Sequence, residues 1–382
     1  MFLHITYKAK IKNLYDERKS EMKKTFKILG RIILGLIALL MAFVLFTIFF
    51  HKIKTKKEIS DLKGRGYYNP VSVGDYSLNV SSFGKNNGNH TVVGLAGLGM
   101  GDFSVSGRKM TESIEKDNLV VFVDRAGYGI SEDTNKEMTN ENIIEDYRLA
   151  LKNAGVKPPY VLMGHSVGGM YASYWASKYP DEIEGVVMLD GSVCTDPSYW
   201  ENTEEEGQDY TFLAKMGMLR YVLRKEWNVW IDDISDEDRR LSDALILMSV
   251  DSNTINKEDQ LFAQNCKTAA DSLVVNNVPK LYIGATSGLM TKEDVIEYNK
   301  WQNAQIEKYK LKEDLLPTEY DDNDEELVEI LEICKRDREQ INNYANKLGN
   351  CEIKYLPGNH AIYWQKPEEC GKLVKDFIDG LN

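Results

Sequence analysis

The chain has 382 residues, of which 43% are hydrophobic and 28% charged, so it is not intrinsically disordered and can build one large domain with insertions or two smaller ones. Residues 1–57 carry 13 Lys and Arg against 3 Asp and Glu, a net charge of +10, whereas residues 58–382 carry 34 against 56, a net charge of −22. The acidic part repels a phosphate backbone, which argues against nucleic acid as a partner.

The first predicted element is a membrane helix. Ile32 to Phe50 form a run of 19 residues without a charge, and about 20 apolar residues suffice to cross a bilayer. A cleaved signal peptide has a shorter apolar centre and small residues at its exit, whereas this run ends in Phe-Phe-His, which favours a retained anchor. Residues 1–31 carry nine basic residues, whereas residues 51–57 carry four. This excess predicts that the N-terminus lies on the inner side of the cell membrane and the large domain on the outer side. Met22 is an alternative start.

After a polar linker at residues 51–66, the segment 67–191 alternates between short apolar runs and segments with helical spacing. Such alternation predicts an α/β fold, in which crossover helices cover both faces of a mostly parallel central sheet. Strands are expected at residues 76–84, 90–97, 118–124, 160–164 and 183–191, and helices at 106–116, 141–155 and 167–180.

The alternation stops at residues 192–278, which we expect to form a helical insertion rich in aromatic residues. These aromatic residues either line an apolar pocket or pack the insertion onto the core. The second part of the core, residues 279–382, contains a further helical insertion at about 291–347. Strands are expected there at 280–285 and 351–358, and a last helix at 367–381. The aromatic residues considered in the first insertion, at 192–278, are Trp200, Tyr210, Tyr221, Trp227 and Trp230.

The five cysteines show no CxxC and no spacing typical of a metal site, and an odd number cannot pair completely. We therefore expect neither a disulfide framework nor a metal centre.

Residues 164–168, Gly-His-Ser-Val-Gly, match the G-x-S-x-G motif between an expected strand and an expected helix. A tight turn there holds Ser166 in a strained conformation, and side chains at 164 or 168 would crowd the neighbouring strand or helix. A serine hydroxyl is a weak nucleophile at neutral pH, so chemistry at Ser166 requires a base, an orienting acid and an oxyanion site.

Four segments together resemble the α/β-hydrolase family: Leu-Ala-Gly-Leu-Gly-Met-Gly at 95–101, residues 124–133, residues 164–190 around the motif, and residues 356–369. The resemblance covers roughly residues 66–382. It implies a serine hydrolase of the esterase or lipase-like branch, in which the insertion at 192–278 is a helical lid.

The base follows by elimination among five histidines, because a general base must reach the serine. His360 follows the last expected strand, in the loop where the family carries its catalytic histidine. Of the other four, His4 and His51 flank the apolar run and His90 precedes an expected strand. His165 lies next to the serine, and its side chain is expected to point away.

The orienting acid departs from the commonest family pattern, because residues 286–290, which follow the expected strand at 280–285, contain no carboxylate. Some members, pancreatic lipase among them, carry the acid one strand earlier in a Leu-Asp context, which this chain matches at Asp190. Asp190 is therefore preferred over Glu293 or Asp294 and over Asp196, although many relatives have an aspartate there that only ties down a loop.

The resemblance also implies an oxyanion hole formed by the backbone N–H groups of Val167 and Leu98. Relatives often have His-Gly before the second donor, where this chain has Ala-Gly, but the donor is a main-chain group. Asp124, Arg125 and Gly127 match a family loop that shapes the site, and we expect them to give support and not chemistry.

Ser166 as nucleophile excludes the family branches that attack with an aspartate, the dehalogenases and epoxide hydrolases. The expected reaction is hydrolysis of a carboxylic ester or related acyl bond, with no metal or organic cofactor. The expected partners are a small acyl substrate, which an anchor makes compatible with lipid-like esters, and the membrane. Two alternatives remain: a peptidase of the proline-iminopeptidase type, with acidic residues at 201–209 to bind an amine, and an inactive relative that serves as a binding module.

Overall fold

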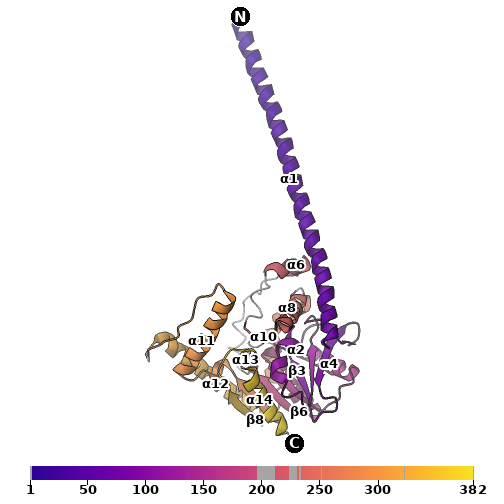
Figure 1. The fold of residues 1–382 in the computed structure, drawn as a ribbon, viewed down its shortest axis with the longest axis vertical. Coiled ribbons are helices and arrows are strands. Elements are labelled where there is room, and N and C mark those ends of the chain that lie inside the picture. Colours follow the sequence, from indigo (N-terminus) through magenta and orange to yellow (C-terminus); the bar gives the residue numbers. More distant parts are fainter. Residues whose placement is uncertain are drawn as a thin grey trace.

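The structure is a computed structural model that describes residues 2–195, 211–222, 230–231, 234–250, 252–321 and 323–381. An α/β domain carries one long helix, α1 (Phe2–Gly64), which projects away from it (Figure 1). The amino terminus lies at the far end of this helix and the carboxyl terminus on the opposite side of the domain.

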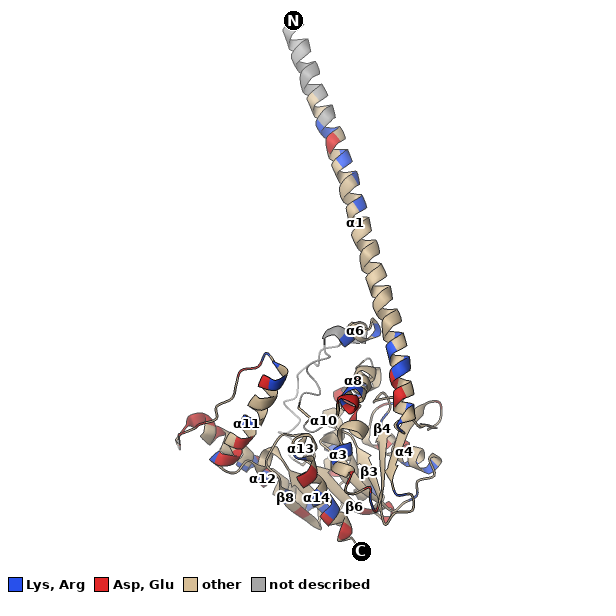
Figure 2. Cartoon of the chain, in the orientation of Figure 1, with Lys and Arg blue, Asp and Glu red and all other residues tan. Residues whose placement is uncertain are grey.

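Within the described residues, α1 is the one helix long and apolar enough to cross a membrane, as judged by length and composition. Figure 2 shows its uncharged stretch with Lys and Arg on both sides. The segment expected as a polar linker does not leave the helix, which continues to Gly64. Residues 52–63 contain no Gly or Pro, and five of them are Lys, which is a good helix former.

The domain is built on an eight-stranded sheet with the order β1-β2-β4-β3-β5-β6-β7-β8. Its first two pairings, β1 with β2 and β2 with β4, are antiparallel, and the remaining pairings are parallel. The mostly parallel sheet expected from the sequence is confirmed. The strands are β1 (Pro70–Ser72), β2 (Ser77–Gly84), β3 (Thr91–Leu95), β4 (Leu119–Asp124), β5 (Tyr160–His165), β6 (Ile183–Leu189), β7 (Lys280–Gly284) and β8 (Cys351–Tyr355).

Helices cover both faces of the sheet, and alternate residues of each strand pack against one layer or the other. One layer consists of α4 (Asn140–Asn153), α5 (Val167–Lys178), α10 (Phe262–Asp271) and α12 (Glu325–Leu348). The other consists of α2 (Phe103–Ser106), α3 (Arg108–Thr111), α13 (Ile362–Gln365) and α14 (Pro367–Asp379). The single helix expected at 106–116 is replaced by the short helices α2 and α3, which Gly107 separates.

Two helical insertions interrupt the α/β alternation. The described part of the first, between β6 and β7, contains α6 (Thr211–Lys215), α7 (Leu219–Val222), α8 (Asp236–Ser249), α9 (Asn253–Gln260) and α10. We call this segment, residues 192–278, the lid. The second insertion contains α11 (Lys292–Tyr309) and α12. Short 3₁₀ turns, η1 (Pro180–Glu182) and η3 (Thr286–Gly288), precede β6 and follow β7.

Candidate active site

Ser166 lies in the turn between β5 and α5 with φ +52° and ψ −123°, a backbone conformation that L-residues rarely adopt. A Cβ atom on Gly164 would lie 2.2 Å from the Gly168 carbonyl oxygen, and one on Gly168 would lie 2.2 Å from the Leu95 carbonyl oxygen of β3. The steric reason for both glycines is thus confirmed. The turn presents Ser166 at the carboxyl end of the central strand.

The same edge of the sheet brings Asp190 next to this turn, because β5 and β6 are adjacent and parallel. The Ser166 N–H donates to the Leu189 carbonyl oxygen at 3.2 Å, and the Ser192 N–H donates to the Ser166 carbonyl oxygen at 2.9 Å. The serine turn and the loop after β6 are therefore held together by main-chain hydrogen bonds on both sides of Asp190.

Asp190 forms a hydrogen bond with His360, whose Nδ1 atom lies 2.8 Å from Asp190 Oδ2. Asp190 is buried and has φ +44°, whereas the His360 side chain is 47% exposed. The Ala285 N–H donates to Asp190 Oδ1 at 2.8 Å, and the Thr286 hydroxyl donates to Oδ2 at 3.3 Å. The loop that carries no carboxylate after β7 therefore supplies donors that hold Asp190 in place.

The other carboxylates considered for the acid are not brought to His360 in the described structure. Asp294 Oδ2 accepts from the N–H groups of Met290 and Thr291, at 3.0 and 2.9 Å, and caps the start of α11. Glu293 is exposed on the first turn of that helix. Asp196 lies outside the described residues.

His165 is a neighbour of His360 that the sequence reasoning treated only as pointing away. Its ring centroid lies 4.7 Å from that of His360, and its Nε2 lies 3.2 Å from the His360 carbonyl oxygen, to which an Nε2–H donates. Burial, together with the nearby His360, lowers the pKa of His165 well below its usual value, so the ring is neutral at pH 7. A neutral His165 can fix the backbone of the His360 loop without adding positive charge.

The backbone around the expected oxyanion donors also approaches Ser166 closely. Val167 is the first residue of α5, so its N–H has no acceptor within the helix. A Cβ atom on Gly97 would lie 3.3 Å from the Ser166 Cβ and 2.8 Å from His165 Nδ1. The absence of a side chain at Gly97 therefore lets the loop that carries Leu98 pass beside the serine.

Arg125 holds that loop from behind. It is buried, and its Nη1 and Nη2 atoms donate to the carbonyl oxygens of Ala96 and Gly97 at 2.6 and 3.1 Å. The Gly97 carbonyl and the Leu98 N–H belong to one planar trans peptide and point in opposite directions. A fixed Gly97 carbonyl therefore fixes the direction of the Leu98 N–H.

The partner of Arg125 comes from the lid, and sequence reasoning missed it. Glu258 of α9 is buried, lies 3.0 Å from Arg125 Nη2 and accepts from the Tyr171 hydroxyl at 2.8 Å. The Arg125 guanidinium also lies over the rings of Tyr128 and Tyr171, 4.1 and 5.2 Å from their centroids. In the sequence Glu258 is one of several charged residues in a row, between Lys257 and Asp259, and this pattern does not indicate its distant partner.

Comparisons with known proteins agree with this architecture. A family model described as the alpha/beta hydrolase fold matches residues 94–224. A solved structure from Acinetobacter baumannii AYE, of a protein assigned as the lipase lip1, has a TM-score of 0.54 at 18% identity and covers 87% of this chain and 96% of its own. The chain has the α/β-hydrolase fold.

Other proteins that are similar to this chain differ in what their names state. The haloalkane dehalogenase DatA of Agrobacterium tumefaciens C58 has a TM-score of 0.52 at 15% identity and covers 82% of this chain and 96% of its own. The uncharacterized protein YbdG of Bacillus subtilis (strain 168) is 25% identical over 94% of this chain and 99% of its own length. Since one fold carries both lipase and dehalogenase names, the reaction must be argued from the site.

Several residues of the α/β-hydrolase lid lie outside what the structure describes. They include Trp200, Tyr210, Trp227, the side chain of Tyr221 and the acidic segment 201–209. Trp230 is described, and its ring centroid lies 6.0 Å from that of Trp301 on α11. The lid therefore contacts the second insertion through an aromatic pair, and an acyl pocket under the lid stays a prediction.

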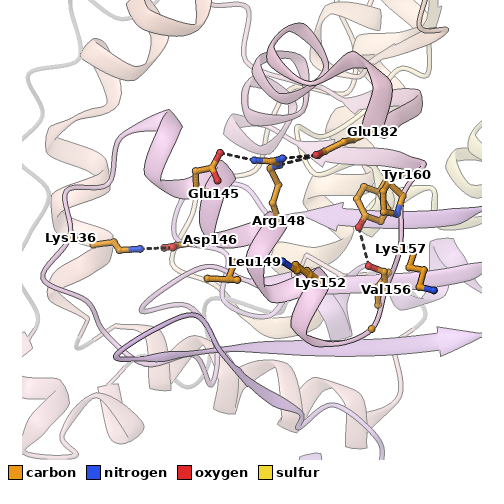
Figure 3. Close-up of a pocket in the computed structure, with 12 residues that line it drawn as sticks. Lys136, Glu145, Asp146, Arg148, Leu149, Lys152, Val156, Lys157, Tyr160 and Glu182 are labelled. Carbon is orange, nitrogen blue, oxygen red and sulfur yellow. Dashed lines mark hydrogen bonds and ion pairs between the residues drawn. The ribbon is translucent and has the colours of Figure 1, made fainter.

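A surface pocket of about 510 Å³ lies away from Ser166, beside α4 and the amino end of β5 (Figure 3). Five of its charged side chains form ion pairs: Arg148 contacts Glu182 and Glu145 at 2.6 and 2.7 Å, and Lys136 contacts Asp146 at 2.7 Å. This pocket is separated from Ser166 by the length of β5.

Proposed function

We propose that this chain is a membrane-anchored serine hydrolase that cleaves a carboxylic ester or a related acyl bond. In this proposal Ser166 is the nucleophile, His360 the general base and Asp190 the orienting acid. The N–H groups of Val167 and Leu98 form the oxyanion hole. The observation that carries the proposal is the 2.8 Å hydrogen bond between Asp190 and His360 at the sheet edge that also bears the strained Ser166.

The reaction divides into two acyl-transfer steps. His360 Nε2 takes the proton of the Ser166 hydroxyl while the oxygen attacks the carbonyl carbon, and the two N–H groups donate to the resulting oxyanion. The tetrahedral intermediate collapses, and His360 gives its proton to the leaving alcohol. Water, deprotonated by His360, then attacks the acyl-enzyme and releases the acid.

Asp190 accounts for two requirements of this chemistry. By accepting from Nδ1–H, its carboxylate selects the tautomer whose Nε2 is free to receive a proton, and it stabilises the imidazolium that forms. The donors from Ala285 and Thr286 hold this carboxylate in a fixed position. Neutral His165 adds no repulsion when His360 becomes charged.

The proposed anchor is the apolar run of α1, with the α/β domain on the outer side of the cell membrane. Its support is the length of the run and the larger number of basic residues before it than directly after it. The substrate proposed is a small acyl compound, and a lipid-like ester fits an enzyme held at a membrane.

The test of the bond type is a panel of p-nitrophenyl esters of increasing acyl length beside aminoacyl-nitroanilides, with Ser166→Ala as control. Ester turnover that disappears in Ser166→Ala supports the proposal. Turnover of aminoacyl-nitroanilides alone would replace it by the iminopeptidase alternative. Absence of turnover, together with no reaction towards a fluorophosphonate, would favour an inactive binding module.

A further inference from the structure

The lid is attached to α1 through Arg220, a buried residue of α7. Its Nη1 and Nη2 atoms each lie 2.7 Å from a carboxylate oxygen of Glu58. Nη2 also donates to the Thr55 hydroxyl at 2.7 Å, and Nε donates to His51 Nδ1 at 2.8 Å. Four hydrogen bonds from one guanidinium therefore join α7 to three turns of α1.

The turn between α6 and α7 packs directly against α1. A Cβ atom on Gly217 would lie 2.5 Å from the His51 Cβ and 2.9 Å from the Thr47 carbonyl oxygen, so only glycine permits this approach. Thr47 is 1% exposed, whereas its neighbours Phe46 and Phe49 are 59% and 64% exposed. The lid thus covers one side of α1 and leaves the other sides of the same turns open.

These contacts set the level of the lid along the apolar run. Thr47 lies within the run Ile32 to Phe50, three residues before its end, which is about 5 Å along a helix. The turn at Gly217 therefore lies at the boundary between the apolar stretch and the basic residues that follow it, Lys52, Lys54, Lys56 and Lys57.

Helix α6, next to this turn, exposes apolar side chains. Phe212 is 67% exposed and Leu213 is 37% exposed, while Lys215 on the same helix is exposed beside them. Figure 1 shows α6 beside α1, on the side of the domain from which the long helix projects. Apolar side chains with adjacent lysines are typical of segments that lie in a membrane interface.

We propose that α6 docks on the surface of the lipid bilayer that α1 crosses, with Phe212 and Leu213 inserted at the level of the headgroups. Arg220 holds the lid to α1 and so fixes the side of the domain that faces the membrane. The lysines of α1 and Lys215 favour anionic lipid. This inference rests on the proposed membrane anchor and goes beyond it, since an anchor alone leaves the orientation of the domain free.

The test uses the full chain in vesicles of phosphatidylcholine and phosphatidylglycerol, with Cys351→Ser to remove the one cysteine that is not buried. An environment-sensitive nitrobenzoxadiazole label is attached at Phe212→Cys. The matched control is Val275→Cys. This site is 69% exposed and lies in the loop before the amino end of β7. Phosphatidylcholine with a nitroxide on its acyl chain should quench the label at 212 and leave the label at 275 unquenched.

A second variant tests the role of Arg220. Arg220→Ala should lower the quenching at position 212, whereas Arg148→Ala, which removes an ion-paired arginine from α4, should leave it unchanged. Resistance of the protein to alkaline extraction from the vesicles reports on the anchor separately. An inserted protein whose label at 212 is no more quenched than that at 275 overturns the docking, whereas a protein removed by alkali overturns the anchor. Equal quenching with and without Arg220 overturns its assigned role.

Discussion

The Nδ1 atom of His360 lies 2.8 Å from the Oδ2 atom of Asp190, and Asp190 follows the strand adjacent to the one that ends before Ser166. The residue that pairs with the histidine thus directly follows β6, while the loop after β7 holds it through Ala285 and Thr286. The loop after β6 therefore supplies the proposed acid, and the loop after β7 supplies the donors that hold it. The role of Asp190 can be tested directly by substitution.

Asp190→Asn should reduce kcat by about 10⁴-fold, because an amide no longer selects the required tautomer or stabilises the imidazolium. Turnover of a p-nitrophenyl ester measures this loss, and circular dichroism checks the fold. The control is Glu293→Gln, an exposed residue that should have no effect. If Glu293→Gln or Asp294→Asn abolishes turnover and Asp190→Asn does not, the assignment of the acid is wrong.

Arg125→Lys should reduce kcat by about 100-fold with little change in KM, since one ammonium cannot reproduce the fork that holds the Ala96 and Gly97 carbonyls. A displaced Leu98 N–H would weaken the hydrogen bond that stabilises the oxyanion. The oxyanion exists in the transition state and not in the bound substrate, so kcat falls and KM changes little. Steady-state kinetics measure the split between kcat and KM. Arg148→Lys, at an ion pair far from Ser166, is the control, and a purely structural role for Arg125 would lower stability without this split.

The pairing of Arg125 with Glu258 is a contact that could not be predicted from the sequence. The alternation of strands and helices, the serine turn and the loop of His360 depend on local patterns, and these could be predicted. Contacts such as that of Arg125 with Glu258 join residues more than a hundred positions apart in different elements. No periodicity encodes such a pair, because it depends on how the lid is placed over the core.

The same reason applies to α1 and to the lid. Local composition indicated an apolar helix, but its contacts through Arg220 with His51 and Glu58 follow only from the packing of α7. The sequence pattern at 106–116 did not predict the break at Gly107 either, where α2 and α3 pack against the sheet as two separate short helices. Propensity is a weak guide where tertiary contacts dominate.

Stability should depend on pH through Asp102, a buried residue whose side chain accepts a hydrogen bond from Ser242 of the lid. Burial raises the pKa of Asp102 from 3.8 to about 6. Between these two values the unfolded chain has lost the proton and the folded chain keeps it, so the free energy of unfolding falls as pH rises and the loss is complete above about 6.

The measurement is urea unfolding of the full chain in detergent at pH 4 to pH 8, compared with Asp102→Asn. The variant should lack this contribution, which is of the order of 3 kcal/mol between pH 4 and pH 7. Asp181→Asn, at a residue exposed in η1, is the control. Equal pH slopes for the wild type and Asp102→Asn would show that Asp102 ionises in the folded state as it does in the unfolded state.

Gly168→Ala should destabilise the domain and remove activity, because the new Cβ would lie 2.2 Å from the Leu95 carbonyl oxygen and force β3 away from the serine turn. Overpacking of this kind costs about 1–3 kcal/mol, and a displaced loop disturbs the site further. Thermal unfolding and ester turnover measure the two effects. Gly30→Ala on α1, where a Cβ would meet nothing within 4 Å, should change neither. Equal behaviour of the two variants would contradict the close contact.

The most direct test of the central claim is reaction of the full chain with a fluorophosphonate, followed by mass spectrometry of the modified peptide. We expect one adduct on Ser166, formed rapidly in the wild type, slowly in His360→Ala and not at all in Ser166→Ala. An adduct on another residue, or labelling of Ser166 at the same rate without His360, would contradict the proposed roles of these two residues.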